Sequence, residues 1–349
     1  LFSIQAWAQS GKLFNTDNQL SSNLATQVFQ DKSGFIWIAT RNGLNTYDGY
    51  HITVMKKDMS NFLGLKSNYI NSIAQDDKGH ILLGTNNSLL EFTGSEFHKI
   101  PMLDSKGEEL ATYVKQVYPL KNKDVAVATS GYGIMIKKKD AQECHAMKGE
   151  VEKLKYIHKL LEDKRGRLWI ITEDGKLYRK ETNGRVTSHL AGTEGVDAQD
   201  IQQDVLGNLY LASKNQGVHL LRAGSNVFTR ISSIGNLPIE NIYISRNNKL
   251  YIGCDGLGIY VYDPQTGFLQ DNPLFSRLVN LAKSKVTSII EDNQGNIWVS
   301  MLQKGVFMQS NIQNDFNYMG FRLGSRNVIG ENCVTSLSIN QGNQVWVGT

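Results

Sequence analysis

The stretch DKSGFIWIAT, residues 31–40, decides the fold because it recurs along the chain. Its clearest further copies are DKRGRLWIIT at residues 163–172 and DNQGNIWVSM at residues 292–301. When the sequence is aligned on the tryptophan of this motif, strand-like units follow one another at spacings of 41 to 48 residues. The aligned column contains Trp37, Leu82, Ala126, Trp169, Tyr210, Tyr251, Trp298 and Trp346. Such a repeat sets the architecture before any single residue is considered.

Each unit reads as four short strands separated by turn residues. The seventh unit predicts strands at 286–291, 296–301, 305–309 and 316–321, with Asp and Gly at the turn positions between the first two. Strand-sized runs broken every few residues leave no room for amphipathic helices. Four strands in a repeat of this length are typical of a propeller blade, whose apolar faces must be covered by neighbouring blades. We therefore predict an all-β, seven-bladed β-propeller of four-stranded antiparallel blades, with the Trp column between blades.

The count of units predicts where the ring ends. Seven complete units run from about residue 24 to residue 321, and an eighth is cut after its second strand at Thr349. We expect residues 9–325 to close a propeller and residues 326–349 to begin a further repeat, which belongs to a second propeller. In the alternative arrangement, residues 12–19 add strands to an incomplete eighth blade, but a half-blade exposes a sheet edge.

The chain is 349 residues long with a net charge of +4 from 37 basic and 33 acidic residues, which gives no electrostatic case for nucleic acid binding. Residues 1–8, LFSIQAWA, end in an A-x-A pattern after an apolar stretch and predict the remnant of a secretory signal peptide. An apolar strand that completes the fold is the alternative. Three cysteines without CxxC spacing predict neither a zinc site nor a disulfide framework.

The repeated polar residues predict structure rather than chemistry. Aspartates recur at equivalent turns, which favours a role in the turns over a ladder of catalytic carboxylates; they are Asp31, Asp76, Asp163, Asp204 and Asp292. The seven histidines show neither HxxxH nor HExxH spacing. No GxSxG or P-loop motif occurs. We therefore predict no catalytic residue, no metal site and no cofactor in this segment.

The motif D-x-x-G-x-[IL]-W-[IV]-x-T, followed by G-L-x-x-[YF], resembles the regulator propeller repeat of the periplasmic sensor regions of hybrid two-component systems. FIWIATRNGLNTYDG at residues 35–49 is close to a consensus copy. The resemblance implies a glycan-sensing ectodomain of an inner-membrane protein, in which two propellers precede a β-sandwich, a membrane helix, a histidine kinase and a response regulator. It also implies an oligosaccharide ligand, a second propeller in the same chain and a homodimeric receptor. The repeat motif carries no ligand residue of that family.

Propellers usually bind ligands on the face formed by the loops between the second and third strands and the loops that lead into the first. By repeat position, this rim predicts the ligand-binding candidates Arg41, Asn42, Tyr132, Glu173, Lys214, Asn215, Asp255, Gln303 and Lys304. A rim of amides and mixed charges with an aromatic residue suits a sugar. Charge alone suggests that Arg41, Lys214 and Lys304 face an acidic glycan. A secreted polysaccharide lyase or glycosidase and a protein-binding scaffold remain alternative functions.

Overall fold

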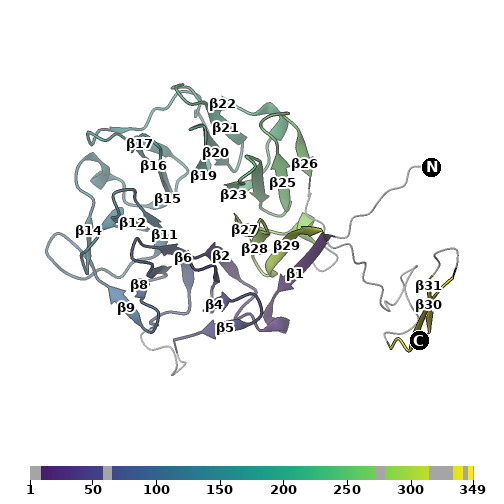
Figure 1. The fold of residues 1–349 in the computed structure, drawn as a ribbon. Coiled ribbons are helices and arrows are strands. Elements are labelled where there is room, and N and C mark those ends of the chain that lie inside the picture. The colour runs from purple at the N-terminus through teal and green to yellow at the C-terminus, as the bar shows by residue number, and fades with distance from the viewer. Residues whose placement is uncertain (1–8, 58–64, 272–279, 314–332, 341–344, 349) are drawn as a thin grey trace. The chain divides into compact units, whose positions relative to one another are not determined.

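The computed structural model describes residues 9–57, 65–271, 280–313, 333–340 and 345–348. Seven sheets lie radially around a central axis, and the inner strand of each sheet faces that axis (Figure 1). This arrangement confirms the predicted seven-bladed β-propeller. By internal contacts the chain divides into the unit Gly11–Asn311, which holds the ring, and a second unit made of Leu1–Ser10 and Ile312–Thr349.

Each blade begins with an inner strand and adds its next strands outward. The inner strands are β2 (Ala25–Gln30), β6 (Ile70–Gln75), β11 (Val114–Pro119), β15 (Ile157–Glu162), β19 (Ala198–Gln203), β23 (Ile239–Ile244) and β27 (Val286–Glu291). The second strands are β3 (Ile36–Thr40), β7 (Ile81–Thr85), β12 (Val125–Thr129), β16 (Leu168–Thr172), β20 (Leu209–Ser213), β24 (Leu250–Cys254) and β28 (Ile297–Met301). We number the blades 1 to 7 in this order.

The outer half of each blade consists of a third and a fourth strand. The third strands are β4 (Gly43–Tyr47), β8 (Leu89–Phe92), β13 (Ile134–Lys137), β17 (Leu177–Lys180), β21 (Gly217–Leu221), β25 (Ile259–Tyr262) and β29 (Gly305–Gln313). The fourth strands of blades 1 to 6 are β5 (Ile52–Met55), β9 (Phe97–Ile100), β14 (Cys144–Ala146), β18 (Val186–Thr187), β22 (Thr229–Arg230) and β26 (Leu269–Asp271). The remaining elements of the ring are β10 (Met102–Leu103), which pairs parallel to β14, and the short 3-10 helices η1 (Thr16–Asn18), η2 (Glu150–Lys153), η3 (Ser232–Ile234) and η4 (Leu281–Lys283).

Blade 7 corrects the strand assignment made from the sequence. Its sheet runs in the order β1-β29-β28-β27, so the N-terminal strand β1 (Gln9–Phe14) takes the fourth position. The predicted fourth strand at 316–321 lies outside the described residues. Phe14, at the end of β1, is fully buried and stacks on Trp298 at 5.3 Å between ring centroids. The residues considered for an incomplete eighth blade thus begin within β1 of blade 7 and continue into η1.

The repeated Asp and Trp form one structural unit in each of three blades. In blade 7, Oδ1 of Asp292 accepts the backbone N–H groups of Gln294 and Asn296, both at 2.9 Å. Its Oδ2 accepts the indole N–H of Trp298 at 2.7 Å. Asp31 and Asp163 bind the indoles of Trp37 and Trp169 in the same way, both at 2.8 Å. This confirms that the repeated aspartates make turns, because their oxygens are occupied by their own hairpins.

The tryptophan column packs between neighbouring blades, as predicted. Trp37 of blade 1 lies in one apolar cluster with Ile70 and Ile73 of blade 2. Trp298 of blade 7 lies in one cluster with Ala25 and Val28 of blade 1, so the same contact closes the ring. Thr287 also donates to the backbone oxygen of Ala25 at 2.9 Å across this last interface.

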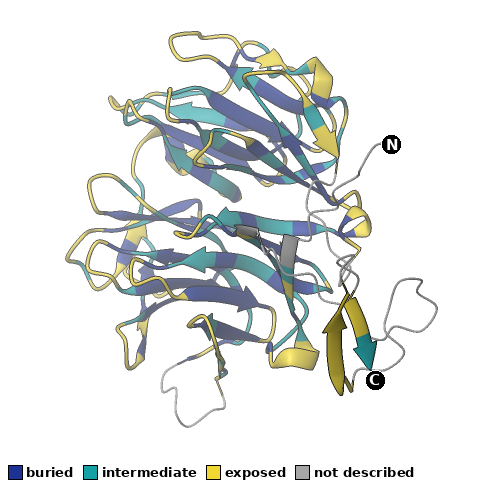
Figure 2. Cartoon of the chain, turned by 45° about the vertical axis from the view of Figure 1, so that its right-hand side comes forward, coloured by how far each residue is buried: buried dark blue, intermediate teal, exposed yellow. Residues whose placement is uncertain are grey.

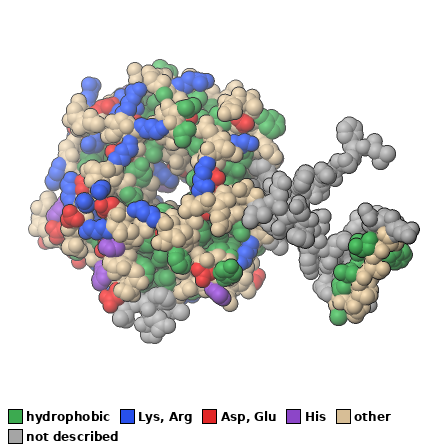
Figure 3. Space-filling model, in the orientation of Figure 1, with side chains coloured by type: hydrophobic (Ala, Val, Ile, Leu, Met, Phe, Trp, Pro, Cys, Tyr) green, Lys and Arg blue, Asp and Glu red, His purple; other side chains and the backbone are tan. Residues whose placement is uncertain are grey.

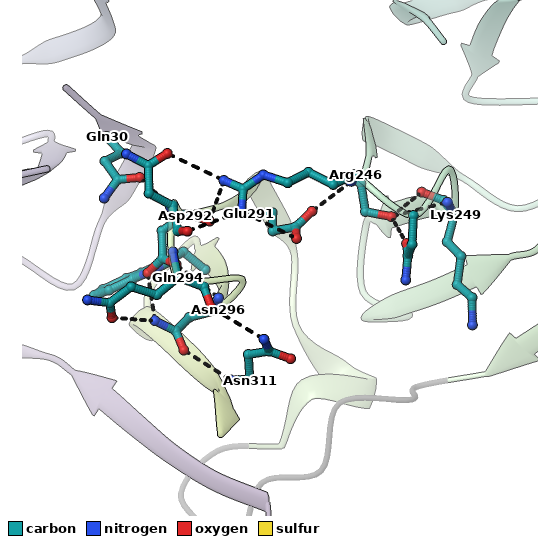
Figure 4. A network of polar contacts seen from close by, with 12 residues as sticks. Gln30, Arg246, Lys249, Glu291, Asp292, Gln294, Asn296 and Asn311 are labelled. Carbon is teal, nitrogen blue, oxygen red and sulfur yellow. Dashed lines mark hydrogen bonds and ion pairs between the residues drawn. The ribbon is translucent and has the colours of Figure 1, made fainter. Parts of the chain in front are cut away.

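A second set of contacts joins the blades at the turn between the first and second strands (Figure 4). The backbone N–H of Arg246 in blade 6 donates to Oε2 of Glu291 at 2.8 Å, and its guanidinium donates to the backbone oxygen of Asp292 at 2.7 Å. The backbone N–H of Asn293 in blade 7 donates to Oε1 of Gln30 in blade 1 at 2.7 Å. Lys32, Lys121 and Lys164 make equivalent backbone and side-chain contacts from blades 1, 3 and 4. The basic residues of these turns are therefore part of the ring's framework.

The second unit contains an antiparallel hairpin of β30 (Ser336–Ile339) and β31 (Val345–Gly348). Its residues are mostly exposed, whereas the strands of the blades are mostly buried (Figure 2). Trp346, which occupies the eighth place in the tryptophan column, is 65% exposed. Within the described residues no helix is long and apolar enough to cross a membrane.

Candidate functional site at the mouth of the central channel

The seven inner strands surround a cavity of about 500 Å³ on the ring axis. All seven carry a register shift at the same place, between their first and third residues. Such a bulge interrupts the strict alternation of side chains, and bulges often re-aim side chains near functional sites. In every blade, the second and third residues of the inner strand line the cavity. Figure 3 shows the hollow at the centre of the ring, with basic side chains near it.

The third residues of the inner strands mainly hold the ring together. In blades 1, 2, 3, 5 and 7 the side chain accepts a hydrogen bond from the backbone N–H of the fourth residue in the next inner strand. These five side chains belong to Gln27, Ser72, Gln116, Asp200 and Ser288. Lys159 of blade 4 has no acceptor to offer. Asp200 compensates, because its Oδ1 accepts the backbone N–H of Ile201 at 2.8 Å and pairs with Lys159 at 3.1 Å.

The second residues of the inner strands divide the ring into two parts, according to whether they bind the next inner strand. In blades 7, 1 and 2, Thr287, Thr26 and Asn71 donate to the first backbone oxygen of the next inner strand at 2.7 to 3.1 Å. We call these three residues the closed sector. In blades 3 to 6 the same position holds Lys115, His158, Gln199 and Glu240, and none of these makes that bond among the described residues. We call these four residues the open sector, because none of them binds the next inner strand in this way. Three of them have other partners: Lys115 pairs with Glu173, Gln199 donates to Asp197 and to the backbone oxygen of Ala198, and Glu240 pairs with Lys285.

A third repeated contact places the sequence-predicted candidates at the mouth of this channel. The backbone N–H of the first turn residue after the second strand donates to the backbone oxygen of the residue just before the inner strand of the same blade. This bond, at 2.9 to 3.0 Å, holds Arg41, Glu173, Lys214 and Asp255 beside the entrance to the inner strands. Four of the nine candidates therefore lie in equivalent positions around the mouth.

These four residues contact the channel residues differently in each blade. Glu173 lies 3.6 Å from the ammonium group of Lys115 and accepts a bond from the hydroxyl of Ser130. Asp255 lies 2.8 Å from Lys285, which also lies 2.9 Å from Glu240. Burial opposes the charge of Lys285, but its hydrogen bonds to Asp255 and Glu240 outweigh that effect and raise its pKa. The carboxylates of the mouth are thus largely engaged by lysines.

Neither Arg41 nor Lys214 forms an ion pair with a carboxylate in the described part of the chain. The guanidinium of Arg41 lies over the ring of Tyr69, 5.4 Å from its centroid. Tyr69 in turn meets Tyr113 edge-on at 6.1 Å, and Tyr113 donates to Asn71 at 2.7 Å. Burial raises the pKa of Tyr113, so its hydroxyl stays protonated. Burial lowers the pKa of His158, and the nearby charge of Lys214 acts in the same direction with a smaller effect.

The other five candidates lie farther along the same turns. Asn215 binds the backbone of Asp197 and Gly195, and the ammonium of Lys304 donates to the backbone oxygen of Asn280 at 2.9 Å and to Ser284 at 3.0 Å. Gln303 has a positive φ of 70°. The side chain of Tyr132 is 43% exposed, and the backbone of Asn42 donates to Thr40. Lys304 and Asn215 thus support loops, and the structure does not bring Arg41, Lys214 and Lys304 together through any shared contact among the described residues.

His158 and Asn241 are the two unusual groups of the channel wall. Burial, with smaller effects from Lys159, Lys115 and Lys214, lowers the pKa of His158 to about 4, so the imidazole is neutral at pH 7. No hydrogen bond joins its ring to another described residue. Asn241 donates to the backbone oxygen of Val286 at 2.8 Å, but its own Oδ1 is buried without a partner. An unpaired buried acceptor is costly, which makes it a place for a bound hydroxyl or water.

Sequence reasoning missed the open sector, although a signal for it was present. The first and fourth residues of the inner strands are aliphatic in nearly every repeat, whereas the second and third vary in charge and size. In an unbulged strand the second and third residues face opposite sides, so the pattern alone does not place both in the channel. The variation between repeats was the usable signal.

One cluster with metal-binding residue types lies outside the channel. Asp76, His80 and Glu91 of blade 2 hold ligand atoms within 4.8 Å of one another. His80 occupies the same turn position as Arg167 in blade 4 and Asn296 in blade 7. The side chains of those two residues donate to the repeated aspartate of their own turn. Lys137 also lies 3.9 Å from Glu91. The cluster is therefore explained by the turn, and a nearby ammonium opposes a cation there. Burial raises the pKa of Cys144 and Cys254 to about 12, so neither thiol is reactive at neutral pH.

Comparison with known proteins confirms the resemblance seen in the sequence. The model of the two-component regulator propeller matches residues 19–42, 64–87 and 280–303. These stretches cover parts of blades 1, 2 and 7. A comparison with curated protein sequences finds no match.

Solved structures share the fold at low sequence identity. The extracellular domain of a protein described as the hybrid two-component system BT3049 of B. thetaiotaomicron has 21% identity and a TM-score of 0.77, covering 98% of this chain and 47% of that one. That of BT4673 from the same organism has 15% identity and a TM-score of 0.72, covering 97% and 46%. The chain thus spans about half the length of these domains. Virginiamycin B lyase from Staphylococcus aureus has 13% identity and a TM-score of 0.67, covering 87% and 99%.

Proposed function

We propose that this propeller, built from two-component regulator propeller repeats, is part of the extracytoplasmic sensor of a hybrid histidine kinase and response regulator. It detects glycan fragments and regulates genes for polysaccharide utilisation. The observation that carries the proposal is the match of the regulator propeller model to three of the repeats. The likeness of the fold to extracellular domains of two-component systems supports it.

The rest of the receptor follows from this proposal. A second propeller of the same chain, a membrane helix and a kinase lie beyond Thr349, and the receptor works as a homodimer in the inner membrane with this domain in the periplasm. Ligand binding shifts the balance between two arrangements of that dimer, which requires only a difference in affinity for the two. The segment itself needs no cofactor and no catalytic group, and it does not bind nucleic acid.

A propeller enzyme that cleaves polysaccharide is the competing function, and the chemistry of the channel disfavours it. A general base works best when its pKa lies near the operating pH. The pKa of His158 is about 4, so its imidazole is a weak base at neutral pH. The carboxylates of Glu173, Glu240 and Asp255 are already paired with lysines. These groups are better suited to binding than to proton transfer.

The test uses the natural host with the complete gene. Transcripts of polysaccharide-utilisation genes are measured after growth on a panel of single glycans, in the wild type and in a deletion strain. The proposal predicts that one glycan induces a gene set in the wild type and not in the deletion strain. Calorimetry of the purified propeller with oligosaccharides of the inducing glycan then tests direct binding. Unchanged induction in the deletion strain refutes the sensor role, and cleaved products after incubation with the purified chain favour the enzyme.

A further inference from the structure

We infer that the open sector of the channel mouth binds the uncharged end of an oligosaccharide, with the tyrosines at the rim as its aromatic platform. This inference rests on the proposed function and adds the place and the chemical class of the ligand. The observation behind it is an asymmetry that the repeat itself does not require.

The asymmetry concerns the second residue of the inner strand, which binds the next blade in some blades and not in others. The closed sector uses its hydroxyl and amide groups to bind the next blade, at 2.9 Å for Thr287 and 2.7 Å for Thr26. Blades 3 to 5 are held without that bond, so the fold does not need the polar side chains of Lys115, His158 and Gln199 for this contact. Gln199 bonds only within its own blade, to Asp197 and Ala198, and the His158 ring makes no hydrogen bond to a described residue. Polar groups of a channel wall that do not join the blades are candidates for ligand contacts.

The charges of the mouth favour a neutral ligand. Three lysines of the mouth (Lys115, Lys159, Lys285) lie 2.8 to 3.6 Å from the four carboxylates Glu173, Asp200, Glu240 and Asp255. A sulfate or carboxylate of an acidic glycan has to compete with these pairs. Lys304 is bonded to its own loop, and Arg41 lies on Tyr69. The basic triad suggested by the sequence is therefore not assembled as an anion site.

The remaining hydrogen-bonding groups match sugar hydroxyls. A neutral imidazole offers one donor and one acceptor, and a hydroxyl can serve both. Asn241 is 7% exposed, and its Oδ1 lacks a donor. A hydroxyl, directly or through a water, completes that bond without adding charge to the buried site. His158 and Asn241 thus supply the kind of contacts that a hexose or pentose needs.

The size and the rim of the cavity fit an oligosaccharide end. A volume of about 500 Å³ lies within the range of small-ligand sites. Tyr113 and Tyr156 directly precede the inner strands of blades 3 and 4, and Tyr132 lies in the turn of blade 3. Backbone bonds join Ser130 to Tyr113 and Glu173 to Tyr156, both at 3.0 Å. These aromatic residues belong to the same blades as the open sector.

The experiment is calorimetry on the purified chain at pH 7.5 with two panels of probes. One panel contains neutral trisaccharides to hexasaccharides of xylan, mannan, arabinan and levan, and the other contains oligogalacturonides and sulfated chondroitin oligosaccharides. The variants His158→Ala and Gln199→Ala remove open-sector groups. Thr26→Ala and Thr287→Ala are matched controls, because they change the same strand position in the closed sector.

We expect a neutral probe to bind and its Kd to rise roughly ten-fold or more in His158→Ala, as is typical for the loss of a buried hydrogen bond. We expect the Thr26→Ala and Thr287→Ala controls to lower Tm but to change Kd by less than about two-fold, since their hydroxyls are engaged by protein groups. The combined variant Arg41→Ala, Lys214→Ala, Lys304→Ala should also keep its affinity. This inference is refuted if an oligosaccharide binds with the same Kd to the wild type and to both open-sector variants. It is also refuted if an acidic probe binds preferentially. Either result leaves the sensor role intact. If no oligosaccharide binds the wild type, the proposed ligand class itself is refuted.

Discussion

The pH dependence of stability gives a quantitative test of the environment assigned to His158. The pKa of this residue falls from about 6.5 in an unfolded chain to about 4 in the folded protein. Between these values the unfolded chain binds more protons, so the stability present above pH 6.5 is lost as the pH falls towards 4. A pKa difference of about 2.5 corresponds to about 3 kcal/mol in full, of which about 2 kcal/mol is lost by pH 5. With roughly 300 ordered residues, that loss lowers Tm by roughly 3 °C.

The assay compares the thermal unfolding of wild type and His158→Gln at pH 7.5 and pH 5.0 by calorimetry. Other groups also titrate in this range, but their effects cancel when the two proteins are compared. We expect the wild type to lose roughly 3 °C more than His158→Gln between the two pH values. The variant His145→Gln, which changes a histidine whose side chain is 57% exposed, should behave like the wild type. Equal losses in wild type and His158→Gln would show that His158 is not buried in a neutral state, and the description of the channel wall would be wrong.

Three further predictions test the framework around the site, each by chemical denaturation. Phe14→Ala should destabilise the ring by about 3 to 5 kcal/mol, because this fully buried side chain holds β1 against Trp298, whereas Phe35→Ala, at a residue 44% exposed, should cost under about 1 kcal/mol. Gly217→Ala should cost more than Gly224→Ala, since both have a positive φ but a Cβ at position 217 lies 2.1 Å from the backbone oxygen of Gly235 and one at 224 meets nothing within 4 Å. Asp292→Ala should cost about 2 to 4 kcal/mol by leaving the buried indole N–H of Trp298 unpaired, while Asp48→Ala, at an exposed turn residue, should cost clearly less. Similar values for a variant and its control would contradict the packing described for that residue.

The repeat made the architecture predictable from the sequence, including the role of its most conspicuous residues. The Trp37 column and the Asp31 turns recur because each blade solves the same packing problem with the same contacts. The closing strand was not predictable in this way. β1 has no copy of the motif, and its partner β29 lies nearly 300 residues away in the sequence, so only the three-dimensional ring brings Phe14 to Trp298.

The candidate site was predictable only in outline. The turns that hold Arg41, Glu173, Lys214 and Asp255 lie at the channel mouth because a shared backbone bond fixes them there. The partners of these residues could not be read from the sequence, because they come from other blades or loops: Glu173 meets Lys115, and Asp255 meets Lys285. The bulges that place His158 and Lys159 together in the channel wall also have no clear sequence signal.

The central claim is that ligand recognition belongs to residues that differ between blades and not to the repeated motif. Its most direct test is a crystal structure of the chain with an oligosaccharide that binds it in calorimetry. We predict that the sugar lies at the channel mouth over blades 3 to 6, with hydroxyls within hydrogen-bond distance of His158 or Glu240. A sugar bound on the outer edge of the blades, or in the channel against Thr26 and Thr287 alone, would contradict it.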